Sequence, residues 1–496
     1  MLKYSSVNHT SFGGKEVNST YRRRFQGIHR EDIGSQIDLR LLGKQLQPIV
    51  EESLRECGKA SYRKGTILTP LFCVFVVLGL AIRRNLSYPH VIDWLVSGLR
   101  WLTCCLPSKL VQDGTLSHAR KRLGVEVFRR IFQKMVAHQD TLAKDFHGLT
   151  SVAFDGTSAT LADTPSNREC FGLPHGGRGA GGYPPLRAVA LLLLPLRMVA
   201  DIAYGPYKGK GSGERSLMRQ IIDRLPHQNL LFLLDAGLYS FEWLHACTRN
   251  NGWQVLAKLS ASVKPKRIPG TTLPDGSYLA VVRKKIEDPT RSQGQRKRYT
   301  TLEITVRIIE YQIPGFRPAR LLTTILDPQI SAKELVLHYH KRWDIEIAFD
   351  EIKTHQCATL RGQAPTILRS KTPELVEQEF YAVVIVYNLV RELIHQAARQ
   401  SNNDSRGISF LDALQCIIDA IPHMSIALRA HAELQYQCQY LIALIGECKI
   451  DRPQRHRINP RVVKVKMSNF KRKTKNHQST IRNLEDELQI LYQEAA

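Results

Sequence analysis

Features that would point to other classes of protein are missing from this 496-residue sequence. Its 10 cysteines include no CxxC pair and no Cys/His quartet at zinc spacing, which argues against a zinc framework and is typical of thiols in a reducing cytosol. The first residues contain no apolar run followed by a small-residue cleavage site, so we expect a cytoplasmic protein. Two glycine-rich stretches, 172–182 and 205–214, do not match GxxxxGK[ST], so we expect no nucleotide cofactor.

Long apolar runs are also scarce. The one candidate, Ile67 to Ile82, is interrupted by Thr69 and Pro70 and is shorter than the roughly 20 residues that span a bilayer. Because proline is favoured in the first turn of a helix, the run predicts a buried helix that begins near Pro70. A single membrane span is the alternative, but we expect no membrane partner.

Acidic residues are outnumbered throughout the chain. Lys and Arg total 70 against 45 Asp and Glu, a formal charge of +25. Such an excess predicts a polyanionic partner, most often nucleic acid, although RNA or an anionic membrane surface would fit the charge equally well. Residues 451–496 continue the trend as a basic tail, which ends in a short apolar helix whose seam could pair two copies of the chain.

The first 147 residues read as helical and basic. Within Gly114 to Phe132, Ser117 could cap a helix that carries Arg120 and Arg122 among five cations. This helix is a candidate for contacting DNA. The alternative is a helix whose cations simply face water, and spacing alone does not choose between the two.

From Thr150 the hydrophobic period changes to that of strands. Ser151 to Phe154 and Leu230 to Leu234 are short apolar runs, and each is followed directly by an aspartate, Asp155 or Asp235. A strand that is apolar on both faces is buried in a sheet. We therefore expect both aspartates where a central strand leaves the sheet, although each could be a plain turn former.

A third candidate segment runs from His338 to His355. At about 100° per residue, a helix here places Tyr339, Arg342, Glu346 and Lys353 on one stripe. The opposite stripe is apolar and can pack on a core: Ile345, Ala348 and Ile352. The plain alternative is a solvated face with ion pairs between neighbouring turns.

Two strand-end aspartates and a helical glutamate suit two-metal phosphoryl transfer. Mg²⁺ prefers carboxylate oxygens, and two ions about 4 Å apart can activate an attacking oxygen and stabilise a leaving one. We expect two Mg²⁺ ions, with Mn²⁺ as a substitute. Composition alone does not choose the three acids, because other carboxylates compete: Asp163, Asp201, Asp223, Asp344, Asp350 and Glu351.

The spacing of the helical stripe carries a resemblance to a known family. Tyr339, Arg342, Glu346 and Lys353 match at every position the Y-(2)-R-(3)-E-(6)-K signature of DDE transposases of the insertion-sequence-four family. The chain is also similar around the aspartates and behind the helix, in FDGTSATLADTPSN, YPPLRAVAL, LLDAGLYS and LRSKTPELVEQEFYAVVIVYNLV. The likeness covers most of residues 30 to 400. Ala236 departs from the arginine that many relatives have after the second aspartate.

The resemblance implies an α/β fold with a ribonuclease-H-like core and a catalytic, metal-binding triad of Asp155, Asp235 and Glu346. It divides the chain into a helical DNA-binding domain for terminal repeats, a catalytic domain, a β-rich insertion, a helical C-terminal region and a basic tail. Their bounds are 1–147, 148–360, 259–328, 361–450 and 451–496.

The resemblance also implies a reaction and its partners. The family cuts transposon ends in double-stranded DNA and joins them to target DNA, often through a hairpin, as a homodimer on two terminal inverted repeats. Tyr339, Arg342 and Lys353 would grip phosphates, and Trp343 would either receive an unstacked base or belong to the core. Tyr311 or Phe316 could replace it. An inactive DNA-binding relic and a nuclease without strand transfer are the alternatives. We expect a nucleoid-associated protein of bacterial type.

Overall fold

The computed structural model describes most of the chain. It covers residues 46–63, 68–98, 113–137, 144–176, 179–180, 182–207, 209, 211–225, 229–249, 252–287, 299–357, 367–427, 431–450, 457–458 and 482–491. Within these ranges, no helix is long and apolar enough to cross a membrane. The predicted basic tail lies almost wholly outside them.

Among the described residues, five helices precede the first strand of the sheet. They are α3 (Leu46–Glu56), α4 (Pro70–Ile82), α5 (Tyr88–Gly98), α6 (Asp113–Leu123) and α7 (Glu126–Ala137). The side chain of Thr69 accepts the Phe72 amide at 3.2 Å, a cap that typically contributes about 1 kcal/mol. The prediction of a buried helix beginning at Pro70 is confirmed, since ten residues of α4 are buried.

The predicted helix from Gly114 to Phe132 is in fact two helices. Gly124, between α6 and α7, has φ +79°, a left-handed conformation that glycine adopts at little cost and that ends a helix. Ser117 therefore lies inside α6 and does not cap it.

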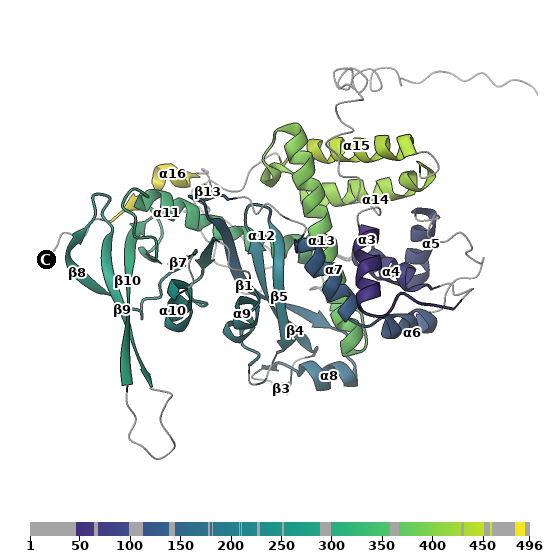
Figure 1. The fold of residues 1–496 in the computed structure, drawn as a ribbon, viewed down its shortest axis with the longest axis horizontal. Helices are drawn as coiled ribbons and strands as arrows, with labels where there is room; N and C mark the ends of the chain where they lie inside the picture. Colours follow the sequence, from purple (N-terminus) through teal and green to yellow (C-terminus); the bar gives the residue numbers. More distant parts are fainter. Residues whose placement is uncertain are drawn as a thin grey trace, which may run out of the picture.

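One mixed sheet of eleven strands runs through the molecule (Figure 1). Nine strands follow each other in the order β5-β4-β1-β6-β7-β11-β10-β9-β8, while β12 pairs with β1 and β15 with β10. Their bounds are β1 Thr150–Leu161, β4 Pro185–Leu193, β5 Met198–Pro206, β6 Leu230–Leu234, β7 Trp253–Lys258, β8 Lys266–Thr272, β9 Tyr278–Glu287, β10 Tyr299–Gln312, β11 Ala319–Thr323, β12 Ile367–Leu368 and β15 Gln489–Ile490.

The direction of the strands changes along this sheet. β5, β4 and β1 are antiparallel neighbours, whereas β1, β6 and β7 run parallel. From β7 onward the sheet is antiparallel again, through β11 to β8. The strands predicted for residues 259–328 are therefore hydrogen-bonded into the same sheet as the strands that carry the aspartates, and β9 and β10 project from the body as a ribbon (Figure 1).

Short helices cover the core strands. They are α8 (Pro165–Phe171), α9 (Glu214–Ile222) and α10 (Phe241–Arg249), while β2 (His175–Gly176) and β3 (Gly179–Ala180) form a small separate ribbon. Helix α13 (Pro373–Ser401), with 19 buried residues among its 29, lies on the same side as α8 and opposite α9 and α10. The N-terminal helices and α13 bury their apolar side chains in one common cluster.

The C-terminal part continues from α13 with the one-turn η5 (Ser405–Gly407), α14 (Phe410–Ala427) and α15 (His431–Glu447). The chain then adds β13 (Arg457–Ile458), β14 (Arg482–Asn483) and α16 (Leu484–Glu487). The predicted apolar helix seam at the end is wrong for the described residues. Only 484–487 are helical, and Gln489 and Ile490 pair with β10 as strand β15, so this segment is already used within the chain.

The segment predicted as one helix from His338 to His355 is helical but not uniform. It consists of α11 (Ala332–Tyr339), a 3₁₀ turn η3 (His340–Trp343), α12 (Asp344–Asp350) and a π-helical turn η4 (Glu351–Gln356). Its predicted apolar stripe is largely confirmed, because Ile345 and Ala348 are at most 1% exposed. π-helical turns are rare and are often found at functional sites.

Candidate active site

The two aspartates follow the last registered pair of two neighbouring parallel strands. That pair is Ala153 of β1 and Leu233 of β6, and Asp155 and Asp235 each lie two residues further along the chain. Strand β6 ends at Leu234, as predicted. β1 continues to Leu161 alongside β4, so Asp155 lies within its strand, just beyond the part paired with β6.

Tyr339 does not occupy the position expected for a phosphate ligand. The residue is only 5% exposed, and its hydroxyl donates to the carbonyl of Leu234 at 3.2 Å. Burial raises the pKa of Tyr339, so the hydroxyl stays a proton donor. In this structure Tyr339 therefore supports the strand end that precedes Asp235.

Arg342 and Glu346 are bonded to each other beside the aspartates. The Arg342 Nη2 atom donates to Glu346 Oε1 at 2.7 Å, with side-chain exposures of 9% and 37%. Burial acts against the charge of Arg342, but Tyr339, Glu346 and Asp235 together raise its pKa. Its Nε atom is buried without a hydrogen-bond partner among the described residues, which leaves a donor for a ligand oxygen.

The described residues do not form a ready-made metal site. In the described part of the chain, no three His, Cys, Asp or Glu side chains are grouped closely enough to hold a metal ion. The acids are nevertheless neighbours, since Glu346 and Glu214 both raise the pKa of Asp155. Burial is the largest cause of that rise, and the Gly156 amide and Arg342 oppose it. A shared metal pair therefore stays a prediction.

Glu214 is a neighbour of the site that the analysis of spacing did not single out. It begins α9, and its carboxylate occupies the space where a Cβ on Gly156 would stand. A side chain at position 156 would therefore displace Glu214. The signal in the sequence was the Gly213-Glu214 pair, which is also similar to the insertion-sequence-four family but does not by itself show that Glu214 lies beside Asp155.

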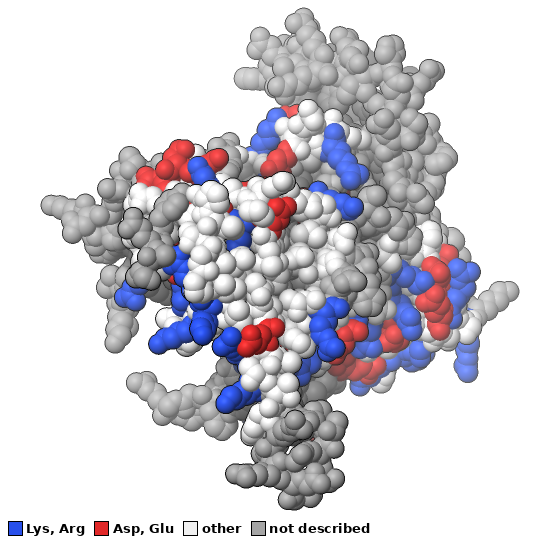
Figure 2. All heavy atoms as spheres, turned by 60° about the vertical axis from the view of Figure 1, so that its left-hand side comes forward, with Lys and Arg blue, Asp and Glu red and all other residues white. Residues whose placement is uncertain are grey.

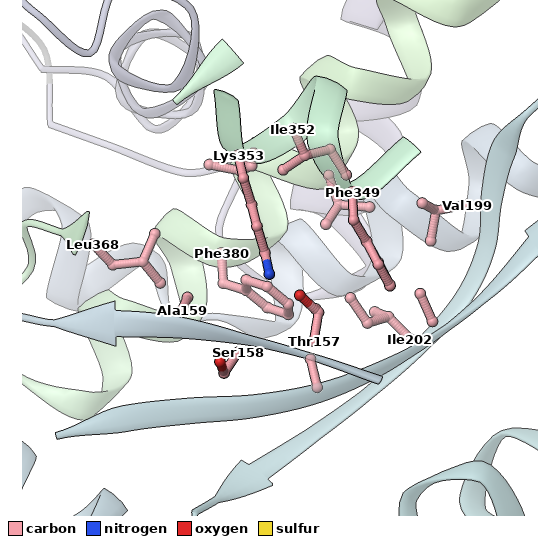
Figure 3. Close-up of a pocket in the computed structure, with 14 residues that line it drawn as sticks. Thr157, Ser158, Ala159, Val199, Ile202, Phe349, Ile352, Lys353, Leu368 and Phe380 are labelled. Carbon is pink, nitrogen blue, oxygen red and sulfur yellow. The ribbon is translucent and has the colours of Figure 1, made fainter. Parts of the chain in front are cut away.

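Lys353 reaches the site from the π-helical turn. Figure 3 shows its side chain running from η4 toward β1, with the nitrogen facing the Thr157 hydroxyl. That hydroxyl is buried and has no hydrogen-bond partner among the described residues. Burial lowers the pKa of Lys353 and Asp155 opposes this effect, so the ammonium group acts on Asp155. The Lys353 side chain and Thr157 line one pocket, whose other walls are largely apolar and include Phe349 and Phe380.

Of the aromatic residues considered for base stacking, Trp343 is the most accessible. It is 48% exposed, so the alternative that it belongs to the core is wrong. Tyr311 is only 4% exposed and its ring is therefore not available to a base. Phe316 is partly buried.

Five of the six competing carboxylates are engaged elsewhere. Asp163 pairs with Arg168, Asp201 with Arg224, Asp344 with Arg197, and Glu351 with Arg391, while Asp350 accepts a hydrogen bond from Thr354. Glu346 is itself paired with Arg342, so these contacts alone do not choose the three acids. The triad of Asp155, Asp235 and Glu346 therefore stays a prediction.

The expectation that Arg120 contacts DNA is wrong. Arg120 is 2% exposed, and its guanidinium donates to Ser370 at 3.2 Å and to the Leu375 carbonyl at 3.0 Å. It joins α6 to the start of α13. Arg122 is exposed and stays a candidate for phosphate contact.

Comparisons with known proteins identify the family to which the chain is similar. The family model described as Transposase DDE domain matches residues 147–389, and the model described as Insertion element 4 transposase N-terminal matches residues 36–133. The chain is 30% identical over 362 residues to Transposase InsG for insertion sequence element IS4 of Escherichia coli (strain K12), covering 71% of this chain and 75% of that protein.

More distant matches were also found. Putative transposase InsZ of Escherichia coli (strain K12) is 25% identical over 174 residues, which cover 33% of this chain and 57% of that protein. The cryo-EM structure of the piggyBac transposase synaptic complex with hairpin DNA matches with a TM-score of 0.40 and 10% identity, over 84% of this chain and 85% of that one. That likeness is too low to inform the chemistry.

The matching family model shows a DDE transposase domain, which implies a ribonuclease-H-like core, and the large mixed α/β sheet agrees with it. The chain belongs to the insertion-sequence-4 family of DDE transposases. The family resemblance drawn from the Tyr339 to Lys353 signature is thereby confirmed, and the protein is a DNA-processing enzyme.

Proposed function

We propose that the chain cuts both ends of a transposon in a Mg²⁺-dependent reaction and joins the freed ends to target DNA, through a hairpin intermediate. One observation carries the proposal: Asp155 and Asp235 each follow the last registered pair of the parallel strands β1 and β6 by two residues, with the Arg342–Glu346 pair beside them. Relics that have lost cutting and nucleases without strand transfer are the competing functions.

The residues present suit divalent cations. Three carboxylates, Asp155, Asp235 and Glu346, offer the oxygen ligands that Mg²⁺ or Mn²⁺ prefers. Burial of Asp155 among other acids leaves negative charge that a cation would offset. When bound, two such ions would activate an attacking oxygen and stabilise the leaving one.

The other residues of the site would bind and orient the DNA strand. Arg342 has an unused buried Nε donor and can hold a phosphate oxygen while its Nη2 holds Glu346. Lys353 adds a positive charge next to Asp155. Tyr339 keeps the strand end at Asp235 in place through Leu234. Each strand-breaking step, by water or by a 3′-hydroxyl, would use this same arrangement.

The hairpin step places a further demand on the protein. A hairpin bends the DNA sharply at its end, and an unstacked base needs an apolar surface. Trp343 is directly adjacent to Arg342 and is 48% exposed, so its ring can take that base. Phe316 is the second choice.

We further propose how the chain is divided and where it binds DNA. The helical domain of residues 1–147 would recognise terminal inverted repeats. The catalytic domain would comprise residues 148–360 and contain the β-rich insertion, residues 259–328. The helical region 361–450 would support the catalytic domain, and the basic tail 451–496 would hold the phosphate backbone of DNA. Figure 2 shows Lys and Arg side chains gathered at the lower left of the described surface. Two copies of the chain would bring two transposon ends together, on nucleoid DNA in the cytoplasm.

The test is cleavage of DNA that carries candidate terminal repeats, with Mg²⁺ and the full-length protein. Glu346→Gln should abolish cleavage and keep DNA binding, because the amide is a poor ligand for a hard cation. Asp350→Asn is the matched control, since Asp350 is an exposed acid on the same helix, and it should cleave like the unmodified chain. Unchanged cleavage by Glu346→Gln would refute the assignment. Binding without cleavage by the unmodified chain would favour the relic, and cleavage without joining would favour the nuclease.

A further inference from the structure

Four buried charged residues form a cluster behind the helix that carries Glu346. Arg197, Arg391, Asp344 and Glu351 are 5%, 2%, 2% and 7% exposed. Arg197 lies in the turn between β4 and β5, Arg391 lies on α13, and the two acids stand at the start of α12 and at the start of the π-helical turn. The cluster therefore joins three segments that are far apart in the sequence.

The contacts within this cluster converge on the two acids. Arg197 donates from Nη1 to Glu351 Oε1 at 3.2 Å and from Nη2 to Asp344 Oδ1 at 3.4 Å. Arg391 donates from Nε to Glu351 Oε2 at 3.0 Å and from Nη2 to the other oxygen. The Tyr387 hydroxyl lies 2.8 Å from the Arg197 carbonyl and 3.1 Å from Glu351 Oε2.

The cluster holds the face of the helix that points away from the site. Asp344 and Glu351 are seven residues apart, so at about 100° per residue they lie within about 20° of each other. Glu346 is then about 140° to 160° away on the helix surface. Fixing Asp344 and Glu351 against Arg197 thus fixes the rotation of α12 and the direction in which Glu346 points.

The cluster also marks the place where the helix type changes. Glu351 is the first residue of the π-helical turn, and Lys353 follows two residues later. Because a π-helical turn contains more residues than an α-helical turn, the point at which it begins sets the direction of every later side chain. Two arginines on Glu351 fix that point.

We infer that Arg197 and Arg391 are positioning residues for strand cleavage: by holding Asp344 and Glu351, they aim Glu346 and Lys353 at the aspartates of the site. This inference rests on the proposed function. The simpler reading is an ion cluster that only stabilises the fold. Buried ion pairs often add little to stability compared with apolar residues of similar size, so a role in geometry accounts better for four buried charges here.

The experiment compares Glu351→Gln with Glu379→Gln in the full-length protein. Glu379 is a suitable control because it is a buried acid on α13, 8% exposed. Its partners are Arg84 at 3.3 Å and the amides of Arg369 and Ser370, none of which belongs to α12. Each variant is measured for thermal stability, DNA affinity, cleavage rate at saturating DNA, and hydrogen exchange of residues 344–356. Arg391→Lys, which keeps the charge, serves as the milder variant.

Glu351→Gln should lower the cleavage rate at saturating DNA by about 10- to 100-fold, as small misplacements of catalytic groups do, with DNA affinity changed less than about threefold. Its hydrogen exchange should rise at residues 344–356. The cleavage rate of Arg391→Lys should lie between the rates of Glu351→Gln and the unmodified chain. Glu379→Gln should show neither effect at a matched loss of stability.

Equal cleavage rates for the two Gln variants, or unchanged exchange at 344–356, would overturn the inference. If Glu351→Gln does not fold, Arg391→Lys decides on the same measurements. If the unmodified chain does not cleave, the proposed function fails, whereas the exchange comparison still decides whether the cluster positions α12.

Discussion

Replacing Tyr339 with Phe would separate the two roles that its hydroxyl could have. In the structure the hydroxyl is a donor to the Leu234 carbonyl at 3.2 Å, next to Asp235. A buried hydrogen bond contributes about 0.5–1.5 kcal/mol net, so we expect the free energy of unfolding to fall by about 1 kcal/mol. A less well held Asp235 should lower the cleavage rate by about tenfold, equivalent to about 1.4 kcal/mol in the barrier.

The assay is single-turnover cleavage at saturating DNA, together with urea unfolding and DNA affinity. Tyr278→Phe is the matched control, because the Tyr278 hydroxyl donates to Glu310 at 3.0 Å and the residue is 9% exposed on β9. The control should lose similar stability and cleave normally. A fall in DNA affinity with an unchanged rate at saturation would refute this reasoning and would show that Tyr339 contacts a phosphate.

Further predictions concern other parts of the chain. Arg120→Ala should lower the free energy of unfolding, measured in urea, by about 2–4 kcal/mol because it leaves buried partners unpaired. Arg122→Ala should change the free energy of unfolding by less than about 0.5 kcal/mol. It should also reduce the slope of DNA affinity against salt concentration by the amount expected for about one lost phosphate contact. An equal loss of stability in both would contradict the burial difference. Burial lowers the pKa of His338 from 6.5 to about 3, so the unfolded chain binds a proton below pH 6.5 that the folded chain does not. The contribution of His338 to the free energy of unfolding should be complete above pH 6.5 and fall by about 2 kcal/mol toward pH 5. His338→Gln should remove this part of the pH dependence of unfolding. Identical pH profiles for the variant and the unmodified chain would show that the dependence does not arise from His338. Trp343→Ala should change the free energy of unfolding by less than about 0.5 kcal/mol and should leave the first strand cut intact. The yield of hairpin DNA, measured on sequencing gels, should fall. A normal hairpin yield would exclude the Trp343 ring from that step.

Strands with a strong local signal were predictable from the sequence. Leu230–Leu234 was expected from five consecutive apolar residues, and all five are buried. The start of α4 followed from Pro70, because the fixed φ of proline is a local effect. The spacing from Tyr339 to Lys353 predicted Glu346 as the helical acid of the site from the sequence alone.

What the sequence did not show depends on partners far along the chain. Arg120 has the composition of a DNA-contacting residue, and only its contacts with Ser370 and Leu375, about 250 positions away, reveal that it is structural. The continuation of β1 through Asp155 depends on pairing with β4. The 3₁₀ and π-helical turns around α12 could not be predicted either, because no local propensity distinguishes them from an ordinary α-helix.

Helix α13 has a consequence for exchanging parts between relatives. Its apolar side chains lie in the same cluster as those of α4 and α7, and Arg120 of α6 is bonded to its first turn. Grafting the first 147 residues of another family member onto this chain would therefore leave two surfaces that were never selected to fit each other. A chimera that changes end recognition should carry the matching face of α13 along with the graft.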